Sequence, residues 1–450
     1  MIIEKLKSSL TNEGYQDLRY ERVKLTSIKV KNHKLQDVSV IEKSGGHARA
    51  LCGGGYGKLS FNDIEKSNKV LKECLEYSRN IPGNKVLAKV PVVKDNIVLN
   101  IEKDPRNVSI EEKIELLLGY CKLASSIEEL EIADGRYYEE YFKKYFVNNE
   151  GTEIEEETII CGMMFSLTAR KGDLTQTVRM TFGGTESFED MYDKNEVVLF
   201  KSKQVVDLLS AEQIKGGTYD VIVDSEVGGL FIHEAFGHLS EADNLLRSDS
   251  LREVMKIGTQ FASSILNVVD DPSKKGHPGS YIYDDEGVRG SKTYLIKDGA
   301  LSGRLHSRET AGYTGEEATG HARAKNYEFT PIVRMGNIYI ENSTDNVEDI
   351  IKSTENGLYV FGSAGGQTSG DSFMFTVQGG YLIENGKITK MVRDISLSGN
   401  LFYTLKNIDM IGNNLAINKR GGCGKSSQLL TASGNGAPCV RIKSMAVGGR

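Results

Sequence analysis

The segment GGLFIHEAFGHLSEADNLL, residues 228–246, follows the strand-like sequence YDVIVDS, residues 219–225, after two intervening residues. Apolar side chains recur in it at helical spacing, so we expect a helix that follows a buried strand. From there to the C-terminus run many short alternating segments separated by Gly, Asp and Asn, which is typical of antiparallel strands joined by tight turns. The sequence therefore predicts a β-rich C-terminal domain, residues 216–450, that carries this helix.

The first half of the chain mixes strands and helices. Alternating apolar residues over 20–40, with a turn near Asn32, predict a hairpin, and a second strand pair is expected around the glycine-rich turn that follows. Ser109 and Glu112 form a capping box ahead of a helix to about residue 127. Strands are expected over 137–184, and a broken helix over 186–209. We predict an α+β protein of two lobes, with an N-terminal domain over residues 1–215 that contains an antiparallel sheet and flanking helices.

Composition excludes several classes of function. The 450 residues contain 56 Lys and Arg against 62 Asp and Glu, a net charge of −6, which argues against a nucleic-acid-binding protein. No apolar run is long enough for a membrane span, and the N-terminus lacks the apolar stretch of a signal peptide. Six cysteines without CxxC spacing are expected to be free thiols, one of which can bind a metal. A cytoplasmic location is the expectation.

The motif His233-Glu234-Ala235-Phe236-Gly237-His238 can supply two imidazole ligands and a general base. Its histidines are five residues apart, one more than in HExxH. On a regular helix five residues turn about 500°, which leaves the two rings about 140° apart and unable to share an ion. A single π-type turn brings them to about 50°, and Gly237 lowers its steric cost. We therefore predict a distorted or ending helix at Phe236–His238. The alternative is an ordinary helix that contains two histidines.

Zinc in a catalytic site takes a third protein ligand and leaves one position open for water. Cys423 is the favoured candidate, because a thiolate between glycines and beside basic side chains is accessible and electrostatically stabilised. Cys439 lies in an alternating segment and is expected to pack as a small apolar residue. Glu241, three residues after His238, can orient that imidazole through a hydrogen bond, or it is simply a charge on the helix surface. Further candidates for the third ligand are Glu241, Asp243, His277, His306 and His321.

The whole chain resembles the TldD/PmbA family of metallopeptidases that process modified peptides. The resemblance is carried by HEAFGH, by LSGN and GGCGK near the C-terminus, and by several longer blocks in the same order along the chain. Those blocks are residues 48–63, 284–290, 323–337, 365–375 and 379–388. The sister PmbA/TldE type typically lacks HExxxH, so this chain resembles the catalytic, TldD type.

The resemblance implies a zinc ion bound by His233, His238 and Cys423, with Glu234 as the catalytic carboxylate. It implies hydrolysis of unfolded or leader peptides by water activated on zinc. It also implies a homodimer, or a heterodimer with a sister subunit, whose N-terminal domains form a cavity for an extended peptide. Two other functions stay open: a non-catalytic peptide-binding or scaffolding subunit, and a zinc amidohydrolase that acts on a small molecule.

Overall fold

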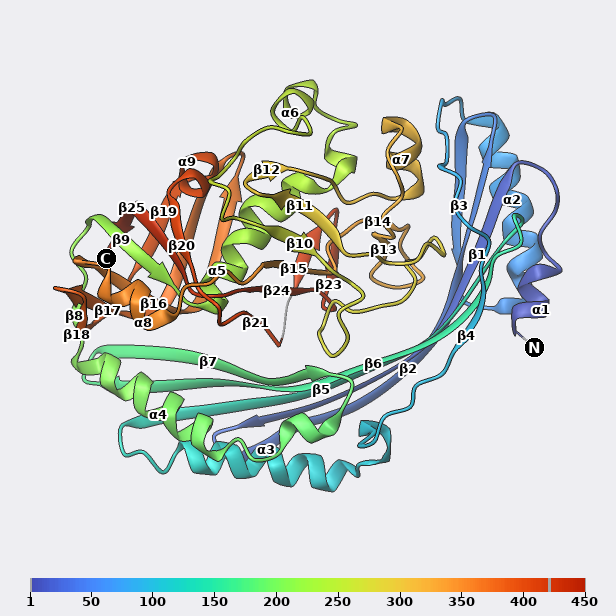
Figure 1. Cartoon of the computed structure of the whole chain (residues 1–450). Coiled ribbons are helices and arrows are strands. Elements are labelled where there is room, and N and C mark those ends of the chain that lie inside the picture. The colour runs from blue at the N-terminus through green and yellow to red at the C-terminus, as the bar shows by residue number, and fades with distance from the viewer. Residues whose placement is uncertain (1, 420–421, 450) are drawn as a thin grey trace.

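A computed structural model describes residues 2–419 and 422–449. The N-terminal half forms one long, curved sheet with the strand order β3-β2-β1-β5-β6, and both β4 and β7 pair with β6 (Figure 1). The pairs are antiparallel except β4–β6. The strands are β1 (Tyr15–Lys31), β2 (Lys34–Cys52), β3 (Gly55–Phe61), β4 (Lys94–Ile97), β5 (Leu130–Asn148), β6 (Glu153–Lys171) and β7 (Leu174–Thr185).

Helices cover the outer face of this sheet. The helices α3 (Ile110–Ala124) and α4 (Asn195–Ser210) lie along its lower part in Figure 1, and α1 (Ile2–Lys7) and α2 (Ser67–Asn80) lie at its opposite end. Leu117 of α3 and Val205 of α4 belong to the same buried cluster as Phe165 of β6. The Ser109 side chain accepts a hydrogen bond from the Glu112 amide (3.1 Å) and begins α3 as predicted. The α+β class, with flanking helices on a largely antiparallel sheet, is confirmed.

The C-terminal half lies on the inner, concave side of the curved sheet (Figure 1). One of its sheets has the order β16-β9-β25-β19-β17-β18-β8, with β20 also pairing with β25, and another has the order β12-β11-β10-β15-β24-β21. The strands are β8 (Glu212–Gln213), β9 (Gly217–Val223), β10 (Val268–Asp270), β11 (Thr293–Lys297), β12 (Ala300–Leu301), β13 (Ala322–Arg323), β14 (Ile332–Val333), β15 (Asn337–Ile340), β16 (Asn356–Ser369), β17 (Ser372–Glu384), β18 (Lys387–Arg393), β19 (Ser396–Asn400), β20 (Ile408–Ile411), β21 (Ala416–Ile417), β22 (Cys423–Lys425), β23 (Gln428–Leu430), β24 (Gly434–Ala437) and β25 (Val440–Gly448). The helices are α5 (Ser225–Phe231), α6 (Asp249–Val254), α7 (Arg308–Thr314), α8 (Val347–Lys352) and α9 (Leu401–Lys406).

The C-terminal half is β-rich as predicted, but its strands are not all antiparallel. The pairs β9–β16, β15–β24 and β8–β18 are parallel. Short alternating segments suggested hairpins, whereas these pairs join strands that lie far apart in the chain. Long connections, one of which contains α5, allow the chain to return in the same direction.

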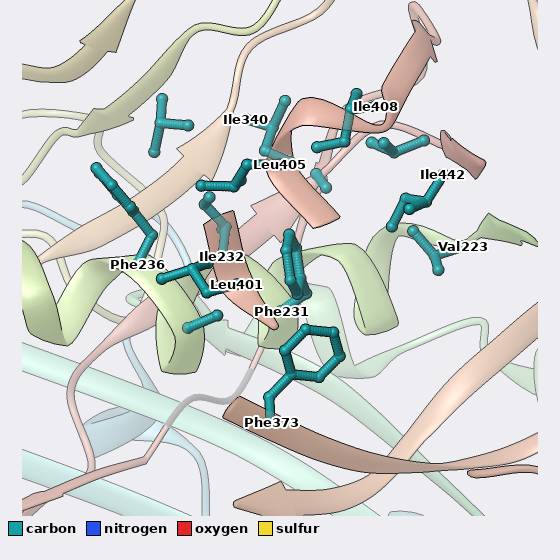
Figure 2. Packing of buried hydrophobic residues seen from close by; sticks show 14 of the residues in the cluster. Val223, Phe231, Ile232, Phe236, Ile340, Phe373, Leu401, Leu405, Ile408 and Ile442 are labelled. Atoms are coloured by element: carbon teal, nitrogen blue, oxygen red, sulfur yellow. The ribbon is translucent and has the colours of Figure 1, made fainter. Parts of the chain in front are cut away.

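The segment that contains α5 lies in the main core of the C-terminal half. Phe231 at the end of α5 contacts Phe373 of β17, with ring centroids 5.3 Å apart (Figure 2). Ile232 and Phe236, which follow on the next turn, are fully buried in the same cluster. Burial of such side chains stabilises the fold by about 1.5–3 kcal/mol each, so this segment has a fixed position.

Buried charges join the two halves. Arg49 of β2 is bound to Asp17 of β1 (Nε–Oδ2 2.9 Å) and to Glu286 of the C-terminal half (Nη1–Oε1 2.7 Å), and all three side chains are buried. Arg19 and Asp285 form a second buried ion pair across the same junction (3.1 Å). The domain boundary near residue 215 stays a prediction. None of the described helices has the length and the apolar content needed to cross a bilayer.

Candidate metal centre

The HExxxH segment begins at the end of a buried strand. Asp224 follows β9, and its side chain accepts hydrogen bonds from the amides of Val227 and Gly362 (both 2.9 Å). The first of these caps the N-terminus of α5, and the second joins that terminus to β16. Strand β9 and the cap together determine where the following turn lies.

The backbone then changes from an α-helix to a π-helical turn over Ile232–Gly237. The His238 amide donates its hydrogen bond to the carbonyl of His233, five residues earlier. The two imidazole rings therefore lie on the same side, with centroids 5.3 Å apart. Gly237 is required here for a second reason, since a Cβ at this position would overlap the Met335 sulfur. The predicted distortion of the helix is confirmed.

Cys423 reaches the histidines from the hairpin of β22 and β23. Its sulfur lies 3.4 Å from His238 Nε2, and the candidate ligand atoms of His233, His238 and Cys423 all lie within 4.8 Å of one another. The buried Arg334 guanidinium donates to the Cys423 carbonyl, which fixes the start of β22. The structure thus places side by side the three residues that the sequence suggested as ligands.

The donor set fits a zinc ion. Both ring nitrogens of His233 are buried and have no hydrogen-bond partner in the described part of the chain, and a bond to a metal ion would satisfy one of them. Burial acts to raise the pKa of the Cys423 thiol, but the adjacent His233 and His238 rings lower it to about 5, which favours the thiolate that binds metals. Two ligands on tetrahedral zinc lie about 3.5 Å apart, so the observed spacing is of the right size.

Glu241 is fully buried and orients His238. Its Oε2 lies 3.0 Å from His238 Nδ1, which leaves Nε2 directed to the side of Cys423. The same Oε2 lies 2.9 Å from the Lys425 ammonium, which also contacts Asp243 (2.7 Å). Burial acts to raise the pKa of Glu241, but His238 and Lys425 lower it below the usual value, so the carboxylate stays charged. A histidine ligand typically has such a carboxylate on its second nitrogen.

Glu234 lies beside the three candidate ligands and not among them. Its carboxylate is 4.0 Å from His238 Nε2, and 27% of its side-chain surface is exposed to solvent. Placed at the solvent side of the centre, Glu234 can contact a water molecule or a substrate there. This is the position that a general base needs.

The other candidates for the third ligand are engaged elsewhere. Cys439 is buried in a small apolar cluster with Ile222, and burial raises the pKa of its thiol. Asp243 pairs with Lys425. The remaining histidines contact other partners or lie apart: His306 contacts Glu316 and Thr310, His321 contacts Asp270 and Thr319, and burial lowers the pKa of the half-buried His277 to about 4.

Two residues of the centre were not identified from the sequence. Lys425 is the last residue of GGCGK, yet nothing in the sequence marks it as the partner of Glu241. Arg334 is contributed by a loop far from both motifs, and a lone arginine in an alternating segment carries no signal for a buried contact. Only the folded chain brings the two residues to the centre.

Known metalloproteases match this chain over almost its whole length. A model of the PmbA/TldA metallopeptidase C-terminal domain matches residues 216–449, and a model of the central domain of the same metallopeptidases matches residues 103–209. Metalloprotease slr0863 of Synechocystis is 37% identical over 96% of this chain and 94% of its own. A zinc metalloprotease TldD homolog of Saccharolobus solfataricus is 31% identical over 98% of each chain.

The fold is also found in a solved structure. TldE from Thermococcus kodakarensis superposes with a TM-score of 0.79 at 16% identity, covering 100% of this chain and 99% of that one. The matches to the family models and to relatives above 30% identity show that the chain belongs to the TldD/PmbA family of metallopeptidases.

Proposed function

We propose that this protein is a zinc-dependent metallopeptidase that hydrolyses unfolded or leader peptides. The observation that carries the proposal is the meeting of two imidazoles, one thiolate and one carboxylate at a single centre. The names of the relatives support a metalloprotease, and one of them names zinc. His233, His238 and Cys423 would hold the ion.

A zinc ion there would acidify a water molecule and polarise a peptide carbonyl. Glu234, at the open side of the centre, accepts the proton of the attacking water and returns it to the leaving amine. Glu241 accepts a hydrogen bond from His238 Nδ1 and so holds the proton on that nitrogen. The lone pair of His238 Nε2 is then directed to the ligand position. Lys425 neutralises the buried charge of Glu241.

The test combines metal content with activity. The purified chain is expected to contain one zinc per molecule, to lose it on Cys423→Ala, and to keep it in the matched control Cys439→Ala. Glu234→Gln should keep zinc and lose cleavage of an unstructured peptide by at least about 100-fold. Zinc without peptide cleavage in the parent would indicate a binding subunit, and cleavage of small amides only would indicate an amidohydrolase.

We further propose a cytoplasmic dimer, formed by two copies or with a sister subunit. The supporting feature is β2, whose residues 34–45 pair with β1 on one side and with no other strand of the described chain. Leu35, Val38, Val40 and Ile41 are exposed along this edge. Open strand edges with apolar side chains are sites of association. The six free thiols in the described chain suit a reducing compartment such as the cytoplasm. Measuring the molecular size of the protein expressed alone tests whether it forms a dimer of two copies.

A further inference from the structure

A large cavity lies between the two halves, next to the candidate metal centre. Its volume is about 1030 Å³. One wall is the inner face of the curved sheet, formed by β1, β5, β6 and β7, and the other comes from α5, β16, β21 and β24. It reaches Leu230, three residues before His233, and Gly422, which precedes Cys423. A molecule that fills the cavity therefore lies beside both segments that carry the candidate ligands.

The cavity carries more positive than negative side chains. Its described lining includes the cations Lys29, Lys31, Arg136, Arg179 and Lys419 and the carboxylates Asp134, Asp224 and Glu226. Asp224 accepts the hydrogen bonds that cap α5, and Glu226 accepts one from the Ser363 amide (3.3 Å). These two carboxylates are thus partly satisfied by the backbone. The local excess of positive charge contrasts with the net charge of −6 of the chain.

The cations on the sheet lie next to one another on the same face. Lys29 and Arg136 are direct cross-strand partners on β1 and β5, so their side chains share one face. Lys31 lies two residues further along the same face. Like charges directly opposite each other destabilise a sheet. Lys29 has one exposed partner, Asp37 (3.4 Å), and the Arg136 Nε donates to Ser27 (3.3 Å).

Two further cations complete the arrangement. Arg179 of β7 is the cross-strand partner of Ser166, and both residues line the cavity. Lys419 comes from the opposite wall, and its backbone lies directly against Gly184 of β7, where a Cβ would overlap the Lys419 carbonyl. Within the described residues, no carboxylate forms an ion pair with Lys31, Arg136, Arg179 or Lys419.

We infer that the cavity binds an acidic segment of the substrate peptide, whose Asp and Glu side chains contact the cations of the curved sheet. This inference rests on the proposed peptidase function and adds the class of substrate. Met164 of β6 and Leu230 of α5 also line the cavity and are partly exposed, which suits a peptide of mixed acidic and apolar residues.

The experiment compares two quenched fluorescent peptides that differ only in Asp and Glu replaced by Asn and Gln. With the full-length zinc-loaded protein, kcat/KM for the acidic peptide should exceed that for the neutral one by about 5-fold or more at low salt, and the ratio should fall as salt rises. The double variant Lys29→Gln, Arg136→Gln should reduce the ratio to below about 2. Lys69→Gln, on the exposed face of α2, is the matched control and keeps both the activity and the ratio.

Binding is measured separately from cleavage, by fluorescence anisotropy of the acidic peptide on the Glu234→Gln protein. Tighter binding of the acidic than of the neutral peptide supports the inference. It does so even if the parent protein cleaves neither peptide, a result that would contradict only the proposed function. Equal kcat/KM values for the two peptides, independent of salt, overturn the inference and leave the peptidase intact. Tighter binding of a single-stranded oligonucleotide of equal charge also overturns it. If the double variant fails to fold, the same ratio of kcat/KM values is measured on Arg136→Glu, and its salt dependence is measured on the parent protein.

Discussion

Replacing Glu241 by glutamine tests how the centre is organised. The Glu241 carboxylate is fully buried, and a single oxygen contacts both His238 (3.0 Å) and Lys425 (2.9 Å). A hydrogen bond to a charged group contributes about 1–1.5 kcal/mol more than a neutral one, so losing the charge at both contacts should lower the free energy of unfolding by about 2–3 kcal/mol. The His238 contact alone, about 1–1.5 kcal/mol, corresponds to a zinc affinity about ten-fold weaker, at the lower end of what such partners contribute.

The assay is competition for zinc with a chromophoric chelator, together with urea unfolding of the metal-free protein. Asp243→Asn is the matched control, because Asp243 contacts Lys425 (2.7 Å) but no imidazole. It should lower the free energy of unfolding by about 1 kcal/mol and change the zinc affinity by less than about two-fold. The reasoning is refuted if Glu241→Gln binds zinc as tightly as the parent, or if the two variants weaken zinc binding equally.

Three other outcomes follow from the structure. Gly237→Ala should lower the free energy of unfolding by about 1–3 kcal/mol in urea, because the added Cβ overlaps the buried Met335 sulfur; unchanged stability would contradict the tight packing of the turn. Glu286→Gln leaves Arg49 with a single carboxylate partner and should cost about 3 kcal/mol by thermal unfolding, whereas a cost below about 0.5 kcal/mol would mean that the junction contributes little. Burial raises the pKa of Glu156 to about 7 from the usual value near 4.5, so its protonated form is favoured in the fold and stability should fall as pH rises from about 4.5 through 7. Glu156→Gln should flatten this part of the stability profile, and an unchanged slope would exclude the residue as its source.

The sequence predicted the turn at the histidines because the argument was purely geometric. Two ligands five positions apart cannot bind one ion from a regular helix, and the π-helical turn over Ile232–Gly237 is the simplest solution. The start of the helix at Ser109 was equally predictable, since a capping box is a local signal. Both predictions depended on residues that are neighbours in the chain.

What could not be predicted depends on contacts between distant segments. Cys423 was favoured over Cys439 by its surroundings in the sequence, yet only the fold shows that its sulfur meets His238. The parallel pairs such as β9–β16 were missed because a short alternating strand has the same pattern in either direction. The curvature of the N-terminal sheet, which creates the cavity, also leaves no local trace in the sequence.

The buried charges at the junction affect how the chain is made. Asp17 and Arg49 leave the ribosome long before Glu286, which is their partner in the finished fold. Until residue 286 has been synthesised, Arg49 has only Asp17 as an ion-pair partner, and Arg19 lacks the Asp285 carboxylate. Contacts this far apart in sequence form late and slowly. Synthesis of this protein therefore includes an interval in which the N-terminal half has formed before its partner surface exists, and partly folded sheets exposed in this way are prone to aggregate.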